Sequence, residues 1–284
     1  MPTVLITGAS TGIGRTTALH LARTGWTVLA GVRDEELGER LAEEAEGGRL
    51  QPLLLDVTDA EQIAAAAAHV KRLSGAEGDS PGRLDALVNN AGIGVGGPLE
   101  LIAIEELRSQ FEVNVLGQIA VTQALLPALR AARGRIVLVS SVGGRVAMAF
   151  TAPYAASKHA LEAIGDALRV ELRTSHVQVA LIEPGSVATP IWDKARAAEQ
   201  ALSVPMELHQ EYGHVPAAMS KTLARTARRG VPPEQVARTI ERALSARKMS
   251  SRYVVGRDAR AMLLLKGLLP DHVFDRFARR ALGV

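Results

Sequence analysis

Two residues of the chain, Tyr154 and Lys158, have the types and the spacing for proton transfer. They begin and end the stretch YAASK, and residues four apart on a helix lie one turn above each other on the same face. A free tyrosine has a pKa of about 10, too high for efficient acid–base work at neutral pH, and a nearby cation such as Lys158 lowers it. The spacing therefore predicts either an acid–base pair or an ordinary helix-surface pair, for which Pro153 suits the first turn.

Two further polar residues could serve the same chemistry. Ser141, in VSSVGG, lies thirteen residues before Tyr154 at the end of an apolar run, where its hydroxyl could hydrogen-bond a substrate oxygen and stabilise developing charge. Asn114, in VNVLG, lies inside a segment of helical length. Each has a structural alternative, because serine can cap a strand end and asparagine can pair with the backbone of a helix.

A glycine-rich turn near the N-terminus could bind a nucleotide. The stretch TGASTGIG (7–14) follows a short apolar run and precedes a helix-length segment. Glycines there allow a tight turn and a close approach of phosphate to the backbone, and the amides of the helix N-terminus then face the pyrophosphate. The spacing G-x-x-x-G-x-G differs from the common G-x-G-x-x-G, and a plain tight turn is the alternative.

The elements that must position these residues follow a regular alternation. Apolar runs typical of parallel strands lie at 3–7, 27–32, 50–57, 84–92, 135–141 and 177–184, with a further short strand expected at 252–256 at the sheet edge. Helix-length segments lie at 13–24, 35–46, 60–73, 104–132 and 153–174. The pattern predicts a single α/β domain over 1–284, a Rossmann-type doubly wound parallel sheet of about seven strands flanked by helices. Residues 190–230 leave this pattern as an irregular, helical insertion that we expect to be a substrate-binding lid, and 257–284 is expected to be a C-terminal helical extension.

Composition narrows the function classes. The chain of 284 residues is 47% hydrophobic and 22% charged, as in soluble globular proteins, and has a net charge of +3. It has no cysteine, which excludes disulfides, thiolate metal sites and a cysteine nucleophile; no metal site is expected. Four Phe, three Tyr and two Trp offer little stacking surface for nucleic acid. No signal peptide is recognised at the N-terminus, and a cytoplasmic location is expected.

With its markers in order, the chain resembles the short-chain dehydrogenase/reductase family from about residue 3 to 190. The matching segments are TGASTGIG, LDV (55–57), NNAG (89–92), VNVLG (113–117), VSSVGG (139–144), YAASK and EPGSVATP (183–190). The resemblance implies that Asn114, Ser141, Tyr154 and Lys158 form a catalytic tetrad. Tyr154 would be the general acid/base, Lys158 would also bind the nicotinamide ribose, and Asn114 would hold a water that relays the proton to solvent.

The resemblance also implies a nicotinamide dinucleotide as cofactor. Its expected binding residues are Gly8, Ser10, Thr11, Gly12, Ile13, Gly14, Arg33, Asp56, Val57, Asn90, Ala91, Gly92, Tyr154, Lys158, Pro184, Gly185, Val187 and Thr189. The second strand ends in LAGVRD, without the acidic residue that binds the ribose of NAD at that point, and Arg33 could pair with a 2′-phosphate. NADP(H) is therefore favoured over NAD(H); the alternative is that Arg33 is a solvated charge and Asp34 takes the role of the acid.

The substrate is expected to be a lipophilic ketone, aldehyde or alcohol. Residues 190–230 mix apolar side chains with polar tips, as pocket linings do, and the candidates for substrate contact beyond Ser141 and Tyr154 are Trp192, Met206 and Tyr212. The C-terminal segment looks like the branch of the family with 17β-hydroxysteroid and retinol dehydrogenases. Two alternatives stay open: a reductase of another substrate, such as an oxoacyl thioester, and a non-catalytic dinucleotide-binding regulatory protein.

The expected partners beyond the small-molecule substrate are further copies of the chain. The resemblance implies a homodimer or homotetramer formed through 104–132 and 153–174. The amphipathic C-terminal stretch LLLKGLLPDHVFDRFARRAL predicts either a packed terminal helix or, at most, peripheral contact with a membrane surface. No binding to nucleic acid is expected.

Overall fold

A seven-stranded, all-parallel sheet forms the centre of the protein, seen in a computed structural model that describes residues 1–45, 47–78, 80–189 and 204–282. The strand order is β3-β2-β1-β4-β5-β6-β7. The strands are β1 (Thr3–Ile6), β2 (Thr27–Val32), β3 (Leu50–Leu54), β4 (Ala86–Asn89), β5 (Arg135–Val139), β6 (Gln178–Pro184) and β7 (Arg252–Val255). The predicted doubly wound, single-domain Rossmann-type fold is confirmed, including β7 at the sheet edge.

Helices connect the strands and extend beyond the sheet. They are α1 (Gly12–Arg23), α2 (Glu35–Glu44), α3 (Ala60–Leu73), α4 (Ile104–Phe111), α5 (Gly117–Ala132), α6 (Ala152–Glu171), α8 (His209–Tyr212), α9 (Val215–Arg229), α10 (Pro233–Ser245), α11 (Arg257–Leu268) and α12 (Asp271–Leu282). Short 3-10 turns lie at Val142–Gly144, Leu172–Ser175 and Met206–Leu208.

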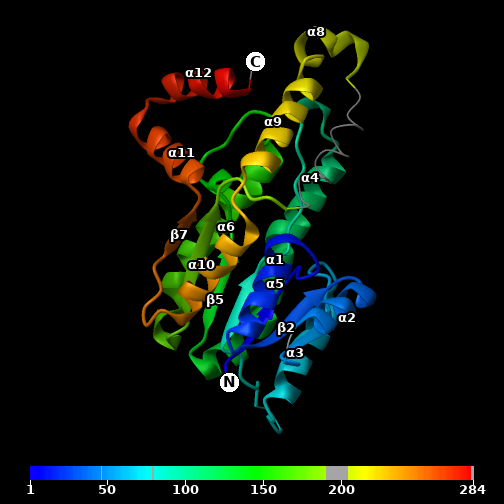
Figure 1. The fold of residues 1–284 in the computed structure, drawn as a ribbon, viewed down its shortest axis with the longest axis vertical. Helices are drawn as coiled ribbons and strands as arrows, with labels where there is room; N and C mark the ends of the chain where they lie inside the picture. Colours follow the sequence, from blue (N-terminus) through cyan, green and yellow to red (C-terminus); the bar gives the residue numbers. More distant parts are fainter. Residues whose placement is uncertain (46, 79, 190–203, 283–284) are drawn as a thin grey trace.

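Helices flank the sheet (Figure 1), and two apolar clusters fill the space between these helices and the two faces of the sheet. Because side chains alternate along a strand, Val4 and Ile6 of β1 face α1 and α10, whereas Leu5 faces the layer of α3 and α5. Strands buried on both faces need apolar residues at every position, which explains the unbroken apolar runs of the sequence.

Most predicted elements match the structure to within a few residues, with two differences. The segment 104–132 was expected to be one helix, but the α-helical bonding is interrupted by a π-helical turn at Glu112–Leu116 that contains Asn114. Helix α10 was not predicted; it packs against α1 and buries Val236 and Ile240.

Helices α8, α9, α11 and α12 lie beyond the sheet, whereas α10 packs against it and β7 forms its edge. In Figure 1, α8 and α9 form the upper end of the molecule. Helices α11 and α12 lie in the same upper part, where α12 contacts α9. The predicted insertion at 190–230 is helical from 206 to 229, while residues 190–203 lie outside the described part.

One helical run has the length and hydropathy of a membrane span. Within the part of the chain that the structure describes, this is Ile104–Ala132, with a mean hydropathy of 1.3. The run comprises α4, the π-helical turn and α5, and α5 packs its Val121, Leu125 and Leu129 into the core. This packing against the sheet accounts for its apolar composition.

Candidate active site

The predicted site residues gather at one edge of the sheet. In a parallel sheet all carboxyl ends of the strands point to the same edge. The glycine-rich turn follows β1, Arg33 follows β2, Asn90 follows β4 and Ser141 follows β5. The strand order places β1 next to β4, so that connections leave to opposite sides there, and such a switch point is where doubly wound sheets bind ligands.

The glycine-rich turn packs against the segment after β4 with no room for side chains. Gly8 has a φ of +65°, and a Cβ there would lie 2.9 Å from the Cα of Ala91. A Cβ on Gly14 would lie 2.2 Å from the carbonyl oxygen of Gly8 and 2.4 Å from Nδ2 of Asn90. These positions therefore require glycine, and the amides at the start of α1 are left at the open edge.

Hydrogen bonds fix this packing. Asn90 Nδ2 donates to the carbonyl oxygens of Thr7 and Gly8 at 2.9 and 3.1 Å, and the amides of Asn90 and Ala91 both donate to Thr7 Oγ1 at 3.0 Å. Thr7 was not singled out by sequence reasoning. The close-packed backbone at a helix N-terminus fits the pyrophosphate of a dinucleotide. Ser10, Thr11, Gly12 and Ile13 would line the same turn, with Gly92 next to Ala91.

The end of β2 offers a cation rather than an acid. The side chain of Arg33 is 63% exposed, and its Nη1 lies 3.9 Å from Oδ2 of Asp56, which follows β3 together with Val57. Asp34 caps α2, because its Oδ1 accepts a hydrogen bond from the amide of Leu37 at 3.2 Å. The carboxylate of Asp34 thus has a structural role, while Arg33 has its guanidinium at the open edge.

Ser141, Tyr154 and Lys158 come together, as predicted. Gly143 lies between Ser141 and Tyr154: its amide donates to Ser141 Oγ at 3.0 Å, and a Cβ on it would lie 3.3 Å from Cε1 of the Tyr154 ring. Lys158 Nζ lies 5.8 Å from the centre of the Tyr154 ring and donates to the carbonyl oxygen of Val139 at 2.8 Å. The end of strand β5 and the first turns of helix α6 thus bring the hydroxyl of Ser141, the phenol of Tyr154 and the ammonium of Lys158 close together.

The pKa of Tyr154 in the chain by itself moves upward, opposite to the net lowering that we expected from Lys158. Burial raises the pKa of Tyr154, and the hydrogen bond with Ser141 opposes this rise. Burial also lowers the pKa of Lys158 to about 8, while the charge of Glu162 opposes that change. The physical reason is desolvation: the buried phenolate loses the water that would stabilise its charge.

Asn114 is buried and fully engaged in local contacts. Its Oδ1 accepts from the amide of Ile93 at 2.8 Å, and its Nδ2 donates to the carbonyl oxygen of Ile93 and to Ser157 Oγ, both at 3.0 Å. The side chain therefore ties the segment after β4 to the first turns of α6. The relay of a proton through a water at Asn114 stays a prediction.

Two glutamines that sequence reasoning missed act with Asn114. Gln110 binds both the amide of Val95 and the carbonyl oxygen of Ile93, and Gln118 Nε2 donates to the carbonyl oxygen of Ala91 at 2.6 Å. All three are buried, and they follow one another four residues apart. A polar stripe at helical spacing in an otherwise apolar helix was the signal that could have revealed them.

The segment after β6 closes the other side of the site. Ser186 and Ala188 pair with Val231: the amide of Val231 donates to the carbonyl oxygen of Ser186 at 2.8 Å, and the amide of Ala188 to that of Val231 at 3.0 Å. Asp258, at the start of α11, accepts from the amide of Ser186 through Oδ2 at 2.8 Å. Pro184, Gly185, Val187 and Thr189, the predicted cofactor residues of this segment, thus lie on a strip held by the C-terminal extension.

The predicted substrate residues of the insertion are not gathered at Tyr154. Met206 is 86% exposed, and the hydroxyl of Tyr212 donates to Glu100 at 2.9 Å; Trp192 lies outside the described residues. A different residue of the insertion comes closer. Met219 of α9 packs over Gly96, and Gly94 of the same segment borders the Tyr154 ring.

Comparisons with known proteins agree with this geometry. The family model described as short chain dehydrogenase matches residues 2–200. The NADPH-dependent 3-dehydrocapnine reductase of Ornithobacterium rhinotracheale is 35% identical over 96% of this chain and 94% of its own, and mouse retinol dehydrogenase 5 is 38% identical over 96% and 86%.

A solved structure shows the same fold. The short-chain dehydrogenase/reductase of Burkholderia phymatum, crystallised in complex with NAD, superposes with a TM-score of 0.78 at 26% identity, covering 94% of this chain and 92% of its own. The chain thus belongs to the short-chain dehydrogenase/reductase family and is an oxidoreductase that acts on CH–OH groups with a nicotinamide dinucleotide as acceptor.

Proposed function

We propose that the chain interconverts a bulky apolar ketone or aldehyde and its alcohol with NADP(H), with Tyr154 as the general acid/base. The observation that carries the proposal is the meeting of Ser141, Tyr154 and Lys158 beside the glycine-rich turn. The bound nicotinamide supplies or accepts the hydride. The glycine-rich turn and Arg33 would hold the adenine end of the dinucleotide, and Lys158 and the segment 184–189 its nicotinamide end.

The protein's own residues handle the proton. In the reducing direction the substrate oxygen gains negative charge, which the hydroxyl of Ser141 stabilises by a hydrogen bond. Tyr154 then donates its phenolic proton to that oxygen. Because burial raises the pKa of Tyr154, the phenol is protonated at neutral pH and ready to act as the acid. In the oxidising direction Tyr154 must first lose this proton, so alcohol oxidation is expected to gain more from alkaline pH than ketone reduction.

The preference for NADP(H) is supported by the end of β2. A 2′-phosphate needs a cation there, and Arg33 is exposed and faces the edge, whereas Asp34 is used as a helix cap. One relative is named as NADPH-dependent. The solved structure from Burkholderia phymatum is in complex with NAD, so the fold alone does not set the preference.

The apolar substrate is supported by the cover over Tyr154. Met219 of α9 packs against Gly96, in the same segment as Gly94, which borders the ring of Tyr154. One relative is named for retinol, an apolar alcohol. We therefore propose that the insertion 190–230 is the lid that selects the substrate, with Trp192, Met206 and Tyr212 as further candidates.

The test follows the absorbance of reduced nicotinamide with NADPH and NADH against retinal, a ketosteroid, an aliphatic ketone and an oxoacyl thioester. We expect NADPH oxidation with the apolar carbonyls. Arg33→Ala should lower the preference for NADPH over NADH by about tenfold or more, since a hydrogen bond between charged groups contributes about 1.5–3 kcal/mol. Arg40→Ala is the matched control, because Arg40 is an exposed arginine on α2 that pairs with Glu36.

Each remaining outcome has a distinct meaning. An unchanged preference in Arg33→Ala would refute the assigned role of Arg33. Turnover of the thioester alone would replace the proposed substrate class. Binding of the dinucleotide, seen by its own fluorescence, without turnover of any substrate in the panel would support the non-catalytic regulatory alternative.

A further inference from the structure

A row of ionisable side chains continues from the proposed catalytic pair along α6. Tyr154, Lys158, Glu162 and Asp166 follow one another four residues apart and share one face of the helix. Lys158 is 4% exposed, and the side chain of Glu162 is 8% exposed. A buried carboxylate thus lies one helical turn beyond the buried ammonium, at a position that the proposed reaction does not itself use.

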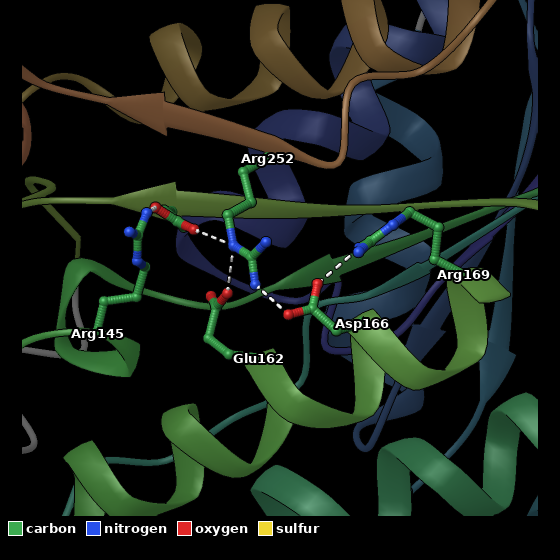
Figure 2. A network of polar contacts seen from close by, with 6 residues as sticks. Arg145, Glu162, Asp166, Arg169 and Arg252 are labelled. Carbon is green, nitrogen blue, oxygen red and sulfur yellow. Dashed lines mark hydrogen bonds and ion pairs between the residues drawn. The ribbon is translucent and has the colours of Figure 1, made fainter.

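Arg252 of β7 binds this carboxylate from the opposite side (Figure 2). Its Nε donates to Glu162 Oε2 at 3.0 Å, and its Nη2 donates to Asp166 Oδ2 at 2.7 Å. The same Nε lies 3.0 Å from Oε1 of Glu183, a fully buried residue of β6. On its other side Glu183 accepts from Nη1 of Arg145 at 3.4 Å. We call these five residues the Arg252 cluster: Arg145, Glu162, Asp166, Glu183 and Arg252.

Two carboxylates of the cluster are buried, and each keeps one oxygen outside the hydrogen bonds. Oε1 of Glu162 and Oε1 of Glu183 are both buried and lack a hydrogen bond among the described residues. Burial and the charge of Glu162 raise the pKa of Glu183, against the opposing effect of Arg145 and Arg252. Arg252 contacts both carboxylates, and Arg145 contacts Glu183 from its other side.

The loop that carries Ser141 seals this arrangement. A Cβ on Gly144 would lie 2.9 Å from the carbonyl oxygen of Lys158, 3.0 Å from Cγ of Glu162 and 2.7 Å from Ser140 Oγ. Backbone therefore covers the space between Lys158 and Glu162. In such a poorly solvated place a single charge acts on its neighbour more strongly than at the surface.

We propose that Glu162 is a positioning residue of the reaction: its carboxylate, bound by Arg252, keeps Lys158 in its ammonium form beside Tyr154. The inference rests on the proposed function, in which that ammonium serves the acid/base tyrosine and the ribose. The groups that face Glu162 are Lys158 and Asp166 on α6, Arg252 on β7, Glu183 on β6 and, through Glu183, Arg145. Burial lowers the pKa of Lys158 to about 8, and the charge of Glu162 is what opposes this lowering.

The consequence appears in the alkaline limb of the pH profile. In the reducing direction, the rate of carbonyl reduction should fall as the pH rises through the pKa of Lys158 and the ammonium is lost. Glu162→Gln keeps the shape of the side chain and removes its charge, so the pKa of Lys158 falls further. The alkaline limb of kcat should then move to lower pH by about one unit, the size typical of a lost opposite charge nearby.

Two matched variants separate charge from structure. Asp166→Asn removes another carboxylate of α6 that binds Arg252. Because Asp166 lies two turns from Lys158 and its side chain is 43% exposed, the alkaline limb of kcat in this variant should coincide with that of the wild type. Glu162→Asp keeps the charge and should restore most of the wild-type limb. Cofactor binding in Glu162→Gln, measured by nicotinamide fluorescence below pH 7, should stay within about twofold of the wild type, because Lys158 is then protonated in both.

A second design covers the case that Glu162→Gln does not fold. Glu162→Met combined with Arg252→Met removes both partners, so that no buried guanidinium is left unpaired at this contact. A smaller shift of the limb in the same direction is expected. The inference would be overturned if the alkaline limb of kcat in the charge-removing variant coincided with that of the wild type. It would also be overturned if this limb shifted equally in Glu162→Gln and Asp166→Asn. The proposed function fails separately: in that case Tyr154→Phe would turn over substrate like the wild type.

Discussion

The two sides of the site differ in how they are attached to the sheet. The cofactor side is held by close backbone packing at Gly14 and by four hydrogen bonds between Thr7, Gly8 and the segment at Asn90 and Ala91. The opposite side, after β6, is held by the backbone pairing at Val231 and by the carboxylate of Asp258.

This difference separates what must stay constant from what can vary. A dinucleotide presents the same pyrophosphate to every member of a fold, and a turn that tolerates no Cβ suits a fixed ligand. Substrates differ, and a segment attached through a few contacts can change without disturbing the sheet. The helices α9, α11 and α12 belong to this second side.

The largest effect is expected from a methyl group on the cofactor side. In Gly14→Ala the new Cβ would meet backbone at 2.2 Å, so the turn must shift. Overpacking of this kind costs about 1–3 kcal/mol of the free energy of unfolding, and nicotinamide fluorescence should show dinucleotide binding weakened at least tenfold. Gly267→Ala is the control: Gly267 lies in α11 with open space around it, and this change should leave binding unchanged and stabilise the fold slightly. Equal binding in both variants would mean that the turn does not hold the dinucleotide.

A smaller effect is expected on the opposite side. Asp258→Ala removes the acceptor for the amide of Ser186, an exposed contact that contributes about 1 kcal/mol. The KM for the dinucleotide should rise about fivefold, with little change in the melting temperature. Asp271→Ala removes an exposed carboxylate of α12 that pairs with Lys266, and it should leave the KM unchanged. If the two variants behave alike, the C-terminal extension does not position the segment after β6.

Local patterns were enough to predict most of the elements, though not α10 or the π-helical turn, and the meeting of the main site residues. The apolar runs predicted the strands. The motifs that contain Gly14, Ser141, Tyr154 and Lys158 could be recognised because each occupies a short stretch of chain. The contacts missed depend on the crossing of distant segments. Arg252 lies 90 residues from Glu162, and Asp258 lies 72 residues from Ser186. The π-helical turn contains Asn114, which binds Ile93 across the site.

The direction of the pKa of Tyr154 was missed for a related reason. Spacing shows that a lysine lies one turn away, but it does not show how deeply the phenol is buried, and here desolvation outweighs the lysine. Dimer or tetramer formation, contact with a membrane surface and the cytoplasmic location stay predictions.

The central claim is that Tyr154 transfers the proton while other residues bind the dinucleotide. Tyr154→Phe removes only the phenolic oxygen, and NADPH binding and turnover of the best apolar carbonyl are measured on the same sample. We expect Tyr154→Phe to bind NADPH as the wild type does, while its kcat falls about 10²–10⁴-fold, the usual contribution of a general acid. A variant that binds NADPH and turns over substrate at the wild-type rate would contradict it.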